Sequence, residues 1–232
     1  MPRHSRCLID GAFYHVLNRG NAKQQVFFDQ VDYSLFLESV SVAVTKHPVD
    51  ILAYCIMPNH FHFLVRPSQA ENLSKCIHLF MNLHIHRHRK KYTTTGHIWQ
   101  GPYKDFIIQD EYHLLVVLRY IEANALRAGV VDSSAKWRWS SQFERSRNLK
   151  YLLNRDMVKL PPNWLEIVDT PLSEEDATKL TRSLERQTPF GKDDWIKSTA
   201  EEHGLKHTIR PRGRQRKNEE GIKGEIKGEW YI

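Results

Sequence analysis

Apolar residues follow two alternating patterns along the chain. Short segments rich in β-branched and aromatic residues, as in strands, lie at residues 13–17, 51–56, 60–65 and 98–108. Longer segments whose apolar positions recur at the spacing of one helix face lie at residues 29–46, 73–91 and 110–129. This order predicts an α+β fold of the ferredoxin-like, split βαβ type, in which helices back one antiparallel sheet.

A change in composition near residue 150 predicts a domain boundary. Residues 1–150 would hold the core, and residues 151–232 would form a mainly helical, basic extension with one helix near residues 173–184. The tail from Asn218 onward is low in complexity, and we expect it to be frayed. A length of 232 residues suits one domain with such an appendage.

Composition narrows the class of protein. Hydrophobic residues at 41% and charged residues at 26% are typical of a globular chain. The formal net charge of +7 favours a polyanionic partner. The three cysteines are widely spaced, so we expect them to be reduced thiols. No apolar stretch long enough for a signal sequence or a membrane span follows Met1, so we expect a cytoplasmic, nucleoid-associated protein without membrane contact.

His60 and His62 form the first candidate site. Side chains two apart in a strand share one face, about 6.5–7 Å from each other, so both imidazoles can converge on one ion while Phe61 points into the core. The alternative is a packed or surface role, because His-x-His recurs by chance among 13 histidines. The run from His84 to His88 has the same spacing on a predicted helix, where we expect a basic, solvated surface.

Tyr120 and Asn124 form the second candidate. They are four residues apart on a predicted helix, and hence lie on the same face. A tyrosine hydroxyl can attack a phosphodiester when a nearby divalent cation polarises the phosphate, and the amide oxygen of Asn124 would add a metal ligand. The alternative for Tyr120 is a core position with its hydroxyl at the surface.

Four segments resemble a known family in the order that the family shows. Residues 57–65 resemble the HUH motif strand of the single-tyrosine transposases, and residues 14–21 resemble the first strand and turn. Residues 96–104 resemble the fourth strand, and residues 118–129 resemble the nucleophile helix. The most similar subgroup is the REP-associated tyrosine transposases, which are IS200-like, and the resemblance covers residues 10–145.

The resemblance implies a function. Tyr120 would be the covalent nucleophile, and His60, His62 and Asn124 would hold Mg²⁺ or Mn²⁺. The reaction would cleave single-stranded DNA at a hairpin, leaving a 5′-phosphotyrosine and a free 3′-hydroxyl that can later rejoin the strands without ATP. The partner would be a DNA hairpin, bound by a monomer or a homodimer.

Two positions depart from the family pattern. Ala125 stands where the family commonly has proline, and Pro102 stands where it commonly has arginine. Neither is a proposed ligand or the nucleophile. A missing arginine removes one phosphate contact, so these departures bear on DNA affinity.

Basic residues suggest where DNA would lie. No acidic residue occurs between Glu71 and Asp105, whereas lysines and arginines do. Such a stretch could bind along a phosphate backbone. The alternative is that its cations only stabilise the carboxyl end of a helix. The run at residues 210–217 resembles an AT-hook for duplex DNA, or is a disordered basic tail. The predicted DNA-contacting residues are Asn18, Arg19, Asn21, Arg87, Arg89, Lys90, Lys91, Lys104, Arg127, Arg210, Arg212 and Arg214.

Two other functions use the same residues. A zinc-dependent hydrolase would need a third carboxylate or thiolate ligand beside the histidines, and its activity would survive Tyr120→Phe. A non-catalytic, domesticated binder of structured single-stranded DNA would use only the basic surface.

Overall fold

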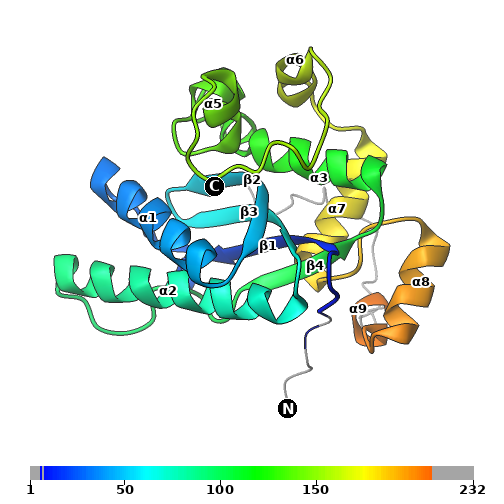
Figure 1. Cartoon of the computed structure of the whole chain (residues 1–232), viewed down its shortest axis with the longest axis horizontal. Coiled ribbons are helices and arrows are strands. Elements are labelled where there is room, and N and C mark those ends of the chain that lie inside the picture. Colours follow the sequence, from blue (N-terminus) through cyan, green and yellow to red (C-terminus); the bar gives the residue numbers. More distant parts are fainter. Residues whose placement is uncertain (1–5, 7, 211–232) are drawn as a thin grey trace, which may run out of the picture.

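The computed structural model describes residue 6 and residues 8–210, and its centre is a four-stranded antiparallel sheet (Figure 1). The strands are β1 (Phe13–Arg19), β2 (Val49–Met57), β3 (His60–Pro67) and β4 (Lys104–Ile108). They lie in the order β2-β3-β1-β4, with β1 and β3 in the centre. This order and the helices between the strands confirm the predicted ferredoxin-like, split βαβ core.

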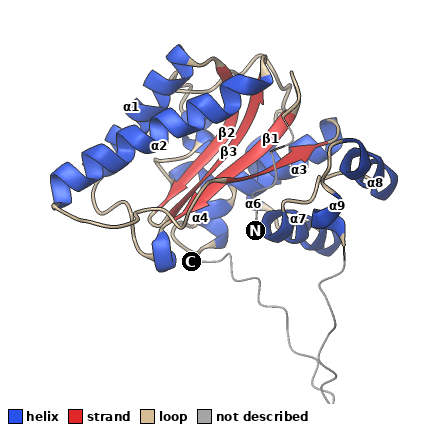
Figure 2. Ribbon diagram, turned by 90° about the horizontal axis from the view of Figure 1, so that it is seen from below, coloured by secondary structure: helices blue, strands red, loops and turns tan. Residues whose placement is uncertain are grey.

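Helices cover both faces of the sheet (Figure 2). Helices α1 (Gln30–Lys46) and α2 (Ala70–Tyr92) pack on one face, and α3 (Glu111–Glu122) packs on the other. Strand alternation divides β3 between these faces, because Phe61 and Phe63 join the cluster under α1 and α2 while Leu64 joins the cluster under α3. The prediction that Phe61 lies in the core is confirmed.

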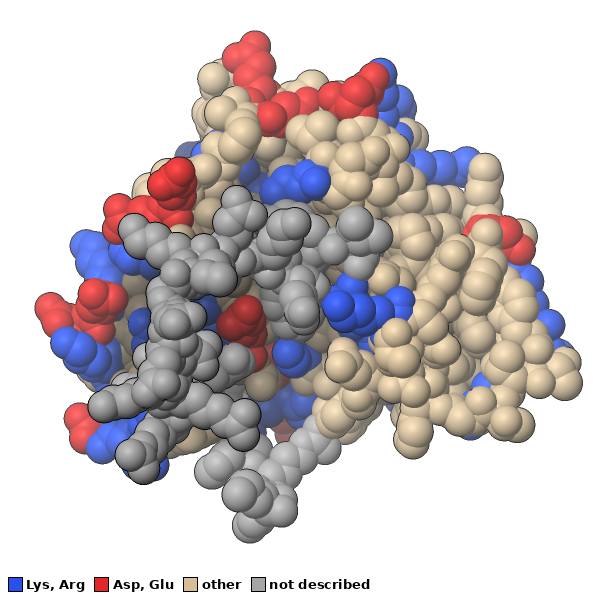
Figure 3. Space-filling view, turned by 180° about the vertical axis from the view of Figure 1, so that it is seen from behind, with Lys and Arg blue, Asp and Glu red and all other residues tan. Residues whose placement is uncertain are grey.

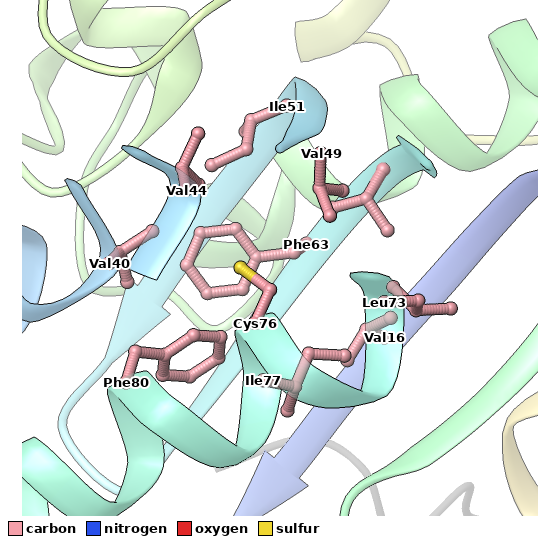
Figure 4. A pocket seen from close by; sticks show the side chains of 11 residues that line it. Val16, Val40, Val44, Val49, Ile51, Phe63, Leu73, Cys76, Ile77 and Phe80 are labelled. Atoms are coloured by element: carbon pink, nitrogen blue, oxygen red, sulfur yellow. The ribbon is translucent and has the colours of Figure 1, made fainter. Parts of the chain in front are cut away.

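A small apolar gap remains between α1, α2 and the sheet (Figure 4). Its volume is about 20 Å³, and Val40, Phe63, Cys76 and Phe80 are among the residues that line it. A gap of this size has room for about one water molecule and offers it no polar partner. It is a packing defect of the core and not a ligand site.

Two predicted segments are shorter in the structure. The predicted strand at residues 98–108 is regular only in β4, because Gly101 has a φ of 146° and Pro102 cannot donate a backbone hydrogen bond. The predicted helix at residues 110–129 divides into α3 and α4 (Asn124–Arg127), with Ala123 at the junction.

The prediction that His84 to His88 form a solvated surface is wrong for His84. This side chain is buried, and its ring lies 5.1 Å from that of Phe36 and 5.3 Å from that of Trp99, measured between centroids. The reason is that α2 packs against α1 along this side, so one residue of the run must face inward. His86 is exposed.

The residues after the core pack along both edges of the sheet. Leu153 bridges Ile51 of β2, and Phe190 bridges Ile108 of β4. Such cover protects edge strands from pairing with other chains. The C-terminal helices are α5 (Ser141–Ser146), α6 (Trp164–Asp169), α7 (Glu174–Arg186), α8 (Asp193–Glu202) and α9 (Lys206–Ile209), so the helix predicted near residues 173–184 is confirmed.

Two further expectations concern the ends of the chain and its surface. Arg210 is exposed at the end of the described range, whereas Arg212, Arg214 and the tail from Asn218 lie outside it.

Every helix within the described range is too short or too polar to cross a membrane. On the face shown in Figure 3, basic and acidic side chains are interspersed at one end, so the positive charge does not form a surface of one sign there.

Candidate active site

The structure brings the four predicted site residues together on the α3 face of the sheet. His60 and His62 project from β3, and their ring centroids lie 5.1 Å apart at an angle of 87°. The Tyr120 ring centroid lies 5.9 Å from that of His62, and Asn124 Oδ1 lies 3.3 Å from His60 Nε2. All four side chains are buried or nearly so.

The junction between α3 and α4 places Tyr120 and Asn124. Backbone bonds from Ala123 N to Arg119 O and from Arg127 N to Ala123 O, both 2.9 Å, continue the helical course across the junction. Asn124 therefore lies one turn beyond Tyr120 and faces the strand. Arg127 turns back, donates to Tyr120 O at 2.6 Å and lies 3.7 Å from the centroid of its ring, which holds the phenol from one side.

A chain of hydrogen bonds fixes the tautomer of His60. Asn59 Nδ2 donates to Lys23 O at 3.2 Å, so the Asn59 oxygen is the atom that lies 2.6 Å from His60 Nδ1. Because that oxygen can only accept, Nδ1 carries the proton and Nε2 keeps its lone pair. Burial, with the charge of Arg19, lowers the pKa of His60 to about 4, so the ring is neutral at pH 7.

The lone pair of His60 Nε2 points at another electron-pair donor, Asn124 Oδ1, at 3.3 Å. Two acceptors in contact repel each other, whereas a cation bound by both stabilises the arrangement. This is the donor geometry expected of a metal site in which an outer partner orients the ligating histidine.

His62 is oriented by a second buried histidine, His15 of β1. His15 Nε2 lies 2.9 Å from His62 Nδ1, and the two rings are nearly parallel, at 6°. Burial lowers the pKa of His15 to about 3 and that of His62 well below its usual value, so each ring is neutral and carries one N–H. One of these two protons lies between His15 Nε2 and His62 Nδ1. When His62 Nδ1 holds that proton, His62 Nε2 is free to bind a metal.

Sequence reasoning missed His15 and Asn59 as site residues. The available signal for His15 was a polar side chain in the middle of an apolar strand, which is fully buried in the structure. For Asn59 the signal was its place in the turn directly before His60. Neither signal alone predicts which atom the side chain would contact.

The donor set differs from the one that the zinc hypothesis requires. Within the described residues, no group of three His, Cys, Asp or Glu side chains is placed to hold a metal ion, so the third carboxylate or thiolate of the zinc hypothesis finds no support. Cys55 is paired with His62 in the sheet, but burial raises the pKa of its thiol to about 12, which leaves it protonated. Two imidazoles and the amide oxygen of Asn124 make a mixed nitrogen and oxygen set.

Two of the residues predicted to contact DNA form ion pairs with acidic residues of another helix and of the turn before it. The sequence pattern did not predict these pairs. Arg87 forms an ion pair of 2.8 Å with Glu38, and Lys91 forms ion pairs of 2.7 Å with Asp29 and Asp32. The stretch without acidic residues is therefore not of one sign in the fold, because α1 and the turn before it bring carboxylates to α2. These pairs join the two helices.

The other predicted contacts lie in different surroundings. Asn18 is buried and donates to Gly101 O at 3.0 Å, so its amide holds the loop before β4. Asn21 and Lys90 are exposed, and Lys104 is half-buried, which lowers its pKa. DNA contact by these residues stays a prediction.

Comparisons with known proteins give a family, a curated relative and a solved structure of similar fold. Residues 9–124 match the family model described as "Transposase IS200 like". A curated protein of Haemophilus influenzae, described as a putative REP-associated tyrosine transposase, is 28% identical over 106 residues, which cover 41% of this chain and 60% of that protein. The solved structure of a REP-associated tyrosine transposase bound to a REP hairpin superposes with a TM-score of 0.55 at 18% identity, over 75% of this chain and 96% of that one.

Proposed function

This chain belongs to the IS200-like transposase family, and on that premise we propose that it cleaves and rejoins single-stranded DNA at hairpin elements. Tyr120 is the nucleophile, and His60, His62 and Asn124 bind a divalent cation. The observation that carries the proposal is the His60 Nε2 lone pair facing Asn124 Oδ1 at 3.3 Å, beside a tyrosine on the same face. The REP hairpin bound to the solved relative supports a DNA hairpin as the partner.

Cleavage is a displacement at phosphorus. The Tyr120 oxygen forms a bond to the scissile phosphorus, and the bond from phosphorus to the 3′ oxygen breaks. The phenol gives up its proton and the leaving 3′ oxygen gains one, so the products are a 5′-phosphotyrosine and a 3′-hydroxyl. A bound Mg²⁺ or Mn²⁺ would polarise the phosphate and offset its developing charge.

The side chains of this protein supply position and charge. Arg127 holds the Tyr120 ring, and Asn59 and His15 keep the metal-binding atoms of His60 and His62 directed into the site. Attack by a 3′-hydroxyl on the phosphotyrosine reverses the step and rejoins DNA. Because the adduct retains the energy of the broken linkage, the reaction needs no nucleotide cofactor.

Trapping the adduct tests this function. A hairpin oligonucleotide with single-stranded flanks is incubated with the protein and Mn²⁺, and covalent protein–DNA species are separated on a denaturing gel. We expect an adduct with the wild type and with Tyr112→Phe, an exposed tyrosine on the same helix, and none with Tyr120→Phe. DNA binding by Tyr120→Phe should stay near the wild-type level.

Two results would overturn the function. One is efficient cutting by Tyr120→Phe, and the other is the absence of an adduct with the wild type. Hairpin binding without any adduct would instead fit the non-catalytic binder.

A further inference from the structure

A surface hollow lies between the segment that precedes α1, the end of α2 and the loop that precedes β4. Its volume is about 320 Å³, within the range of small-ligand pockets, which begins at about 300 Å³. Side chains that line it include Gln24, Gln25, Phe28, His88, Tyr92 and His97. The proposed catalytic step uses none of these residues.

One wall of the hollow is aromatic. Phe28 is 54% exposed, which is unusual for a large apolar side chain. Its ring centroid lies 5.0 Å from that of Tyr92, which lies 4.7 Å from that of His88. The Phe28 and Tyr92 rings are tilted by 57° rather than stacked, so they do not cover each other's faces and can accept a flat ligand.

The rest of the lining is largely polar, and two cationic side chains lie near it. Gln24 Nε2 donates to Ile98 O at 3.2 Å, which fixes the amide against the loop. Arg89 does not line the hollow, but it donates to Gly96 O at 2.8 Å, between the lining residues Thr95 and His97. Lys90 is exposed next to it on α2. Flat aromatic faces, amides and positive charge together match a nucleotide, with its planar base, polar base edges and anionic phosphate.

The hollow is connected to the candidate active site through one loop. Gln24 follows Lys23, whose carbonyl accepts from Asn59, the residue that orients His60. Three residues later, Phe27 N donates to Pro58 O at 3.0 Å. The wall of the hollow and the start of β3 are therefore held together.

We propose that this hollow binds one unpaired nucleobase of the single-stranded DNA that flanks the hairpin, stacked on Phe28. The proposal rests on the proposed function, since it takes single-stranded DNA as the substrate. Holding one base here would fix the position of the flank relative to Tyr120 and so help to select the bond that is cut.

Binding measurements with two oligonucleotides test the proposal. One is the hairpin with a short single-stranded flank on each side, and the other is the same hairpin without flanks. We expect Phe28→Ala to weaken binding of the flanked hairpin by about 5- to 150-fold, the loss of one base stack, and to leave the trimmed hairpin unaffected. Val31→Ala changes an apolar residue of similar exposure, 55%, in the first turn of α1, and should change neither affinity.

A fluorescent base analogue locates the base. With 2-aminopurine placed at each flank position in turn, one position should be quenched by the wild-type protein and recover in Phe28→Ala. Equal affinities of wild type and Phe28→Ala for the flanked hairpin, or an equal loss for both oligonucleotides, would overturn the proposal. If the Tyr120 adduct still forms in that case, the proposed function stands and only the base pocket fails; a wild-type protein that binds neither oligonucleotide refutes both.

Discussion

His15 Nε2 and His62 Nδ1 lie 2.9 Å apart on neighbouring strands, within the buried face under α3. The pair has one proton between these two nitrogens, and His62 binds a cation through Nε2 only when it holds that proton itself. His15 must then act as the acceptor, and its own proton moves to Nδ1, which has no hydrogen-bond partner among the described residues. In the state proposed to bind metal, His15 therefore has a buried N–H donor without an acceptor among the described residues.

The first prediction follows from this pair. His15→Phe removes the acceptor and should lower the affinity for Mn²⁺, measured by calorimetry without DNA, by about 10- to 100-fold. The new ring fills the space of the old one but leaves buried His62 Nδ1 without its partner, so the free energy of unfolding should fall by about 1–3 kcal/mol. His15→Gln, which keeps an acceptor, should recover part of the affinity. Unchanged Mn²⁺ affinity in folded His15→Phe would contradict the role of His15.

A second prediction concerns Asn59. Asn59→Ala frees the His60 ring to rotate and to change tautomer, so Mn²⁺ affinity should fall by about 10-fold or more. Asn82→Ala, an exposed asparagine of α2, is the matched control and should bind Mn²⁺ as the wild type does. Equal affinities of the two variants would show that the bond from Asn59 to His60 does not orient the ligand.

Local periodicity explains which parts of the site the sequence could predict. The two-residue period of β3 places His60 and His62 on one face, and the helical spacing places Asn124 a turn after Tyr120. His15 could not be assigned, because its partner depends on which strands are neighbours and in what register. Register is a property of the whole sheet and not of either strand alone.

Contacts between distant helices explain the remaining errors. His84 is covered by α1 and by the loop around Trp99, and neither contact can be read from the repeat of histidines. The carboxylates that pair with Arg87 and Lys91 lie about fifty to sixty residues earlier in the chain. A count of charges along the sequence therefore overestimates the charge that α2 offers to a phosphate backbone.

A third prediction concerns pH. The pKa values of buried His15, His60 and His84 are lowered to about 3, 4 and 3, chiefly by burial, whereas in the unfolded chain these groups titrate near 6.5. Between those values the unfolded chain binds more protons, so the free energy of unfolding should fall as pH drops from about 6.5 towards 4. Each group contributes a slope of about 1.4 kcal/mol per pH unit in that window.

Urea unfolding at several pH values measures this slope. His84→Phe removes one buried group outside the catalytic face and should make the pH dependence shallower. His86→Phe alters an exposed histidine of the same helix and should leave the slope as in the wild type. Stability of the wild type that is independent of pH between 4 and 6.5 would contradict the assignment of these histidines as neutral, buried groups.

The final prediction concerns the attachment of the C-terminal segment to the core. Glu122, at the end of α3, is fully buried and accepts from Ser141 Oγ at 2.6 Å, Arg145 Nε at 2.8 Å and Trp164 Nε1 at 2.7 Å. Removing Arg145 leaves the buried carboxylate without its cationic partner, so Arg145→Ala should lower the free energy of unfolding by about 3–5 kcal/mol. Lys179→Ala, which breaks an exposed ion pair, should cost only about 0–1 kcal/mol.

Chemical denaturation distinguishes these magnitudes, and the double variant Glu122→Gln with Arg145→Ala refines the test. With the buried charge removed, loss of Arg145 should cost less than it does alone, because the neutral amide needs fewer donors. If the losses in the free energy of unfolding from the two substitutions simply add, Arg145 stabilises the fold through contacts other than the one with Glu122. Glu122 and Tyr120 lie in the same last turn of α3. Arg145→Ala should therefore also slow adduct formation more than it weakens hairpin binding, because the position of the proposed nucleophile depends on this turn.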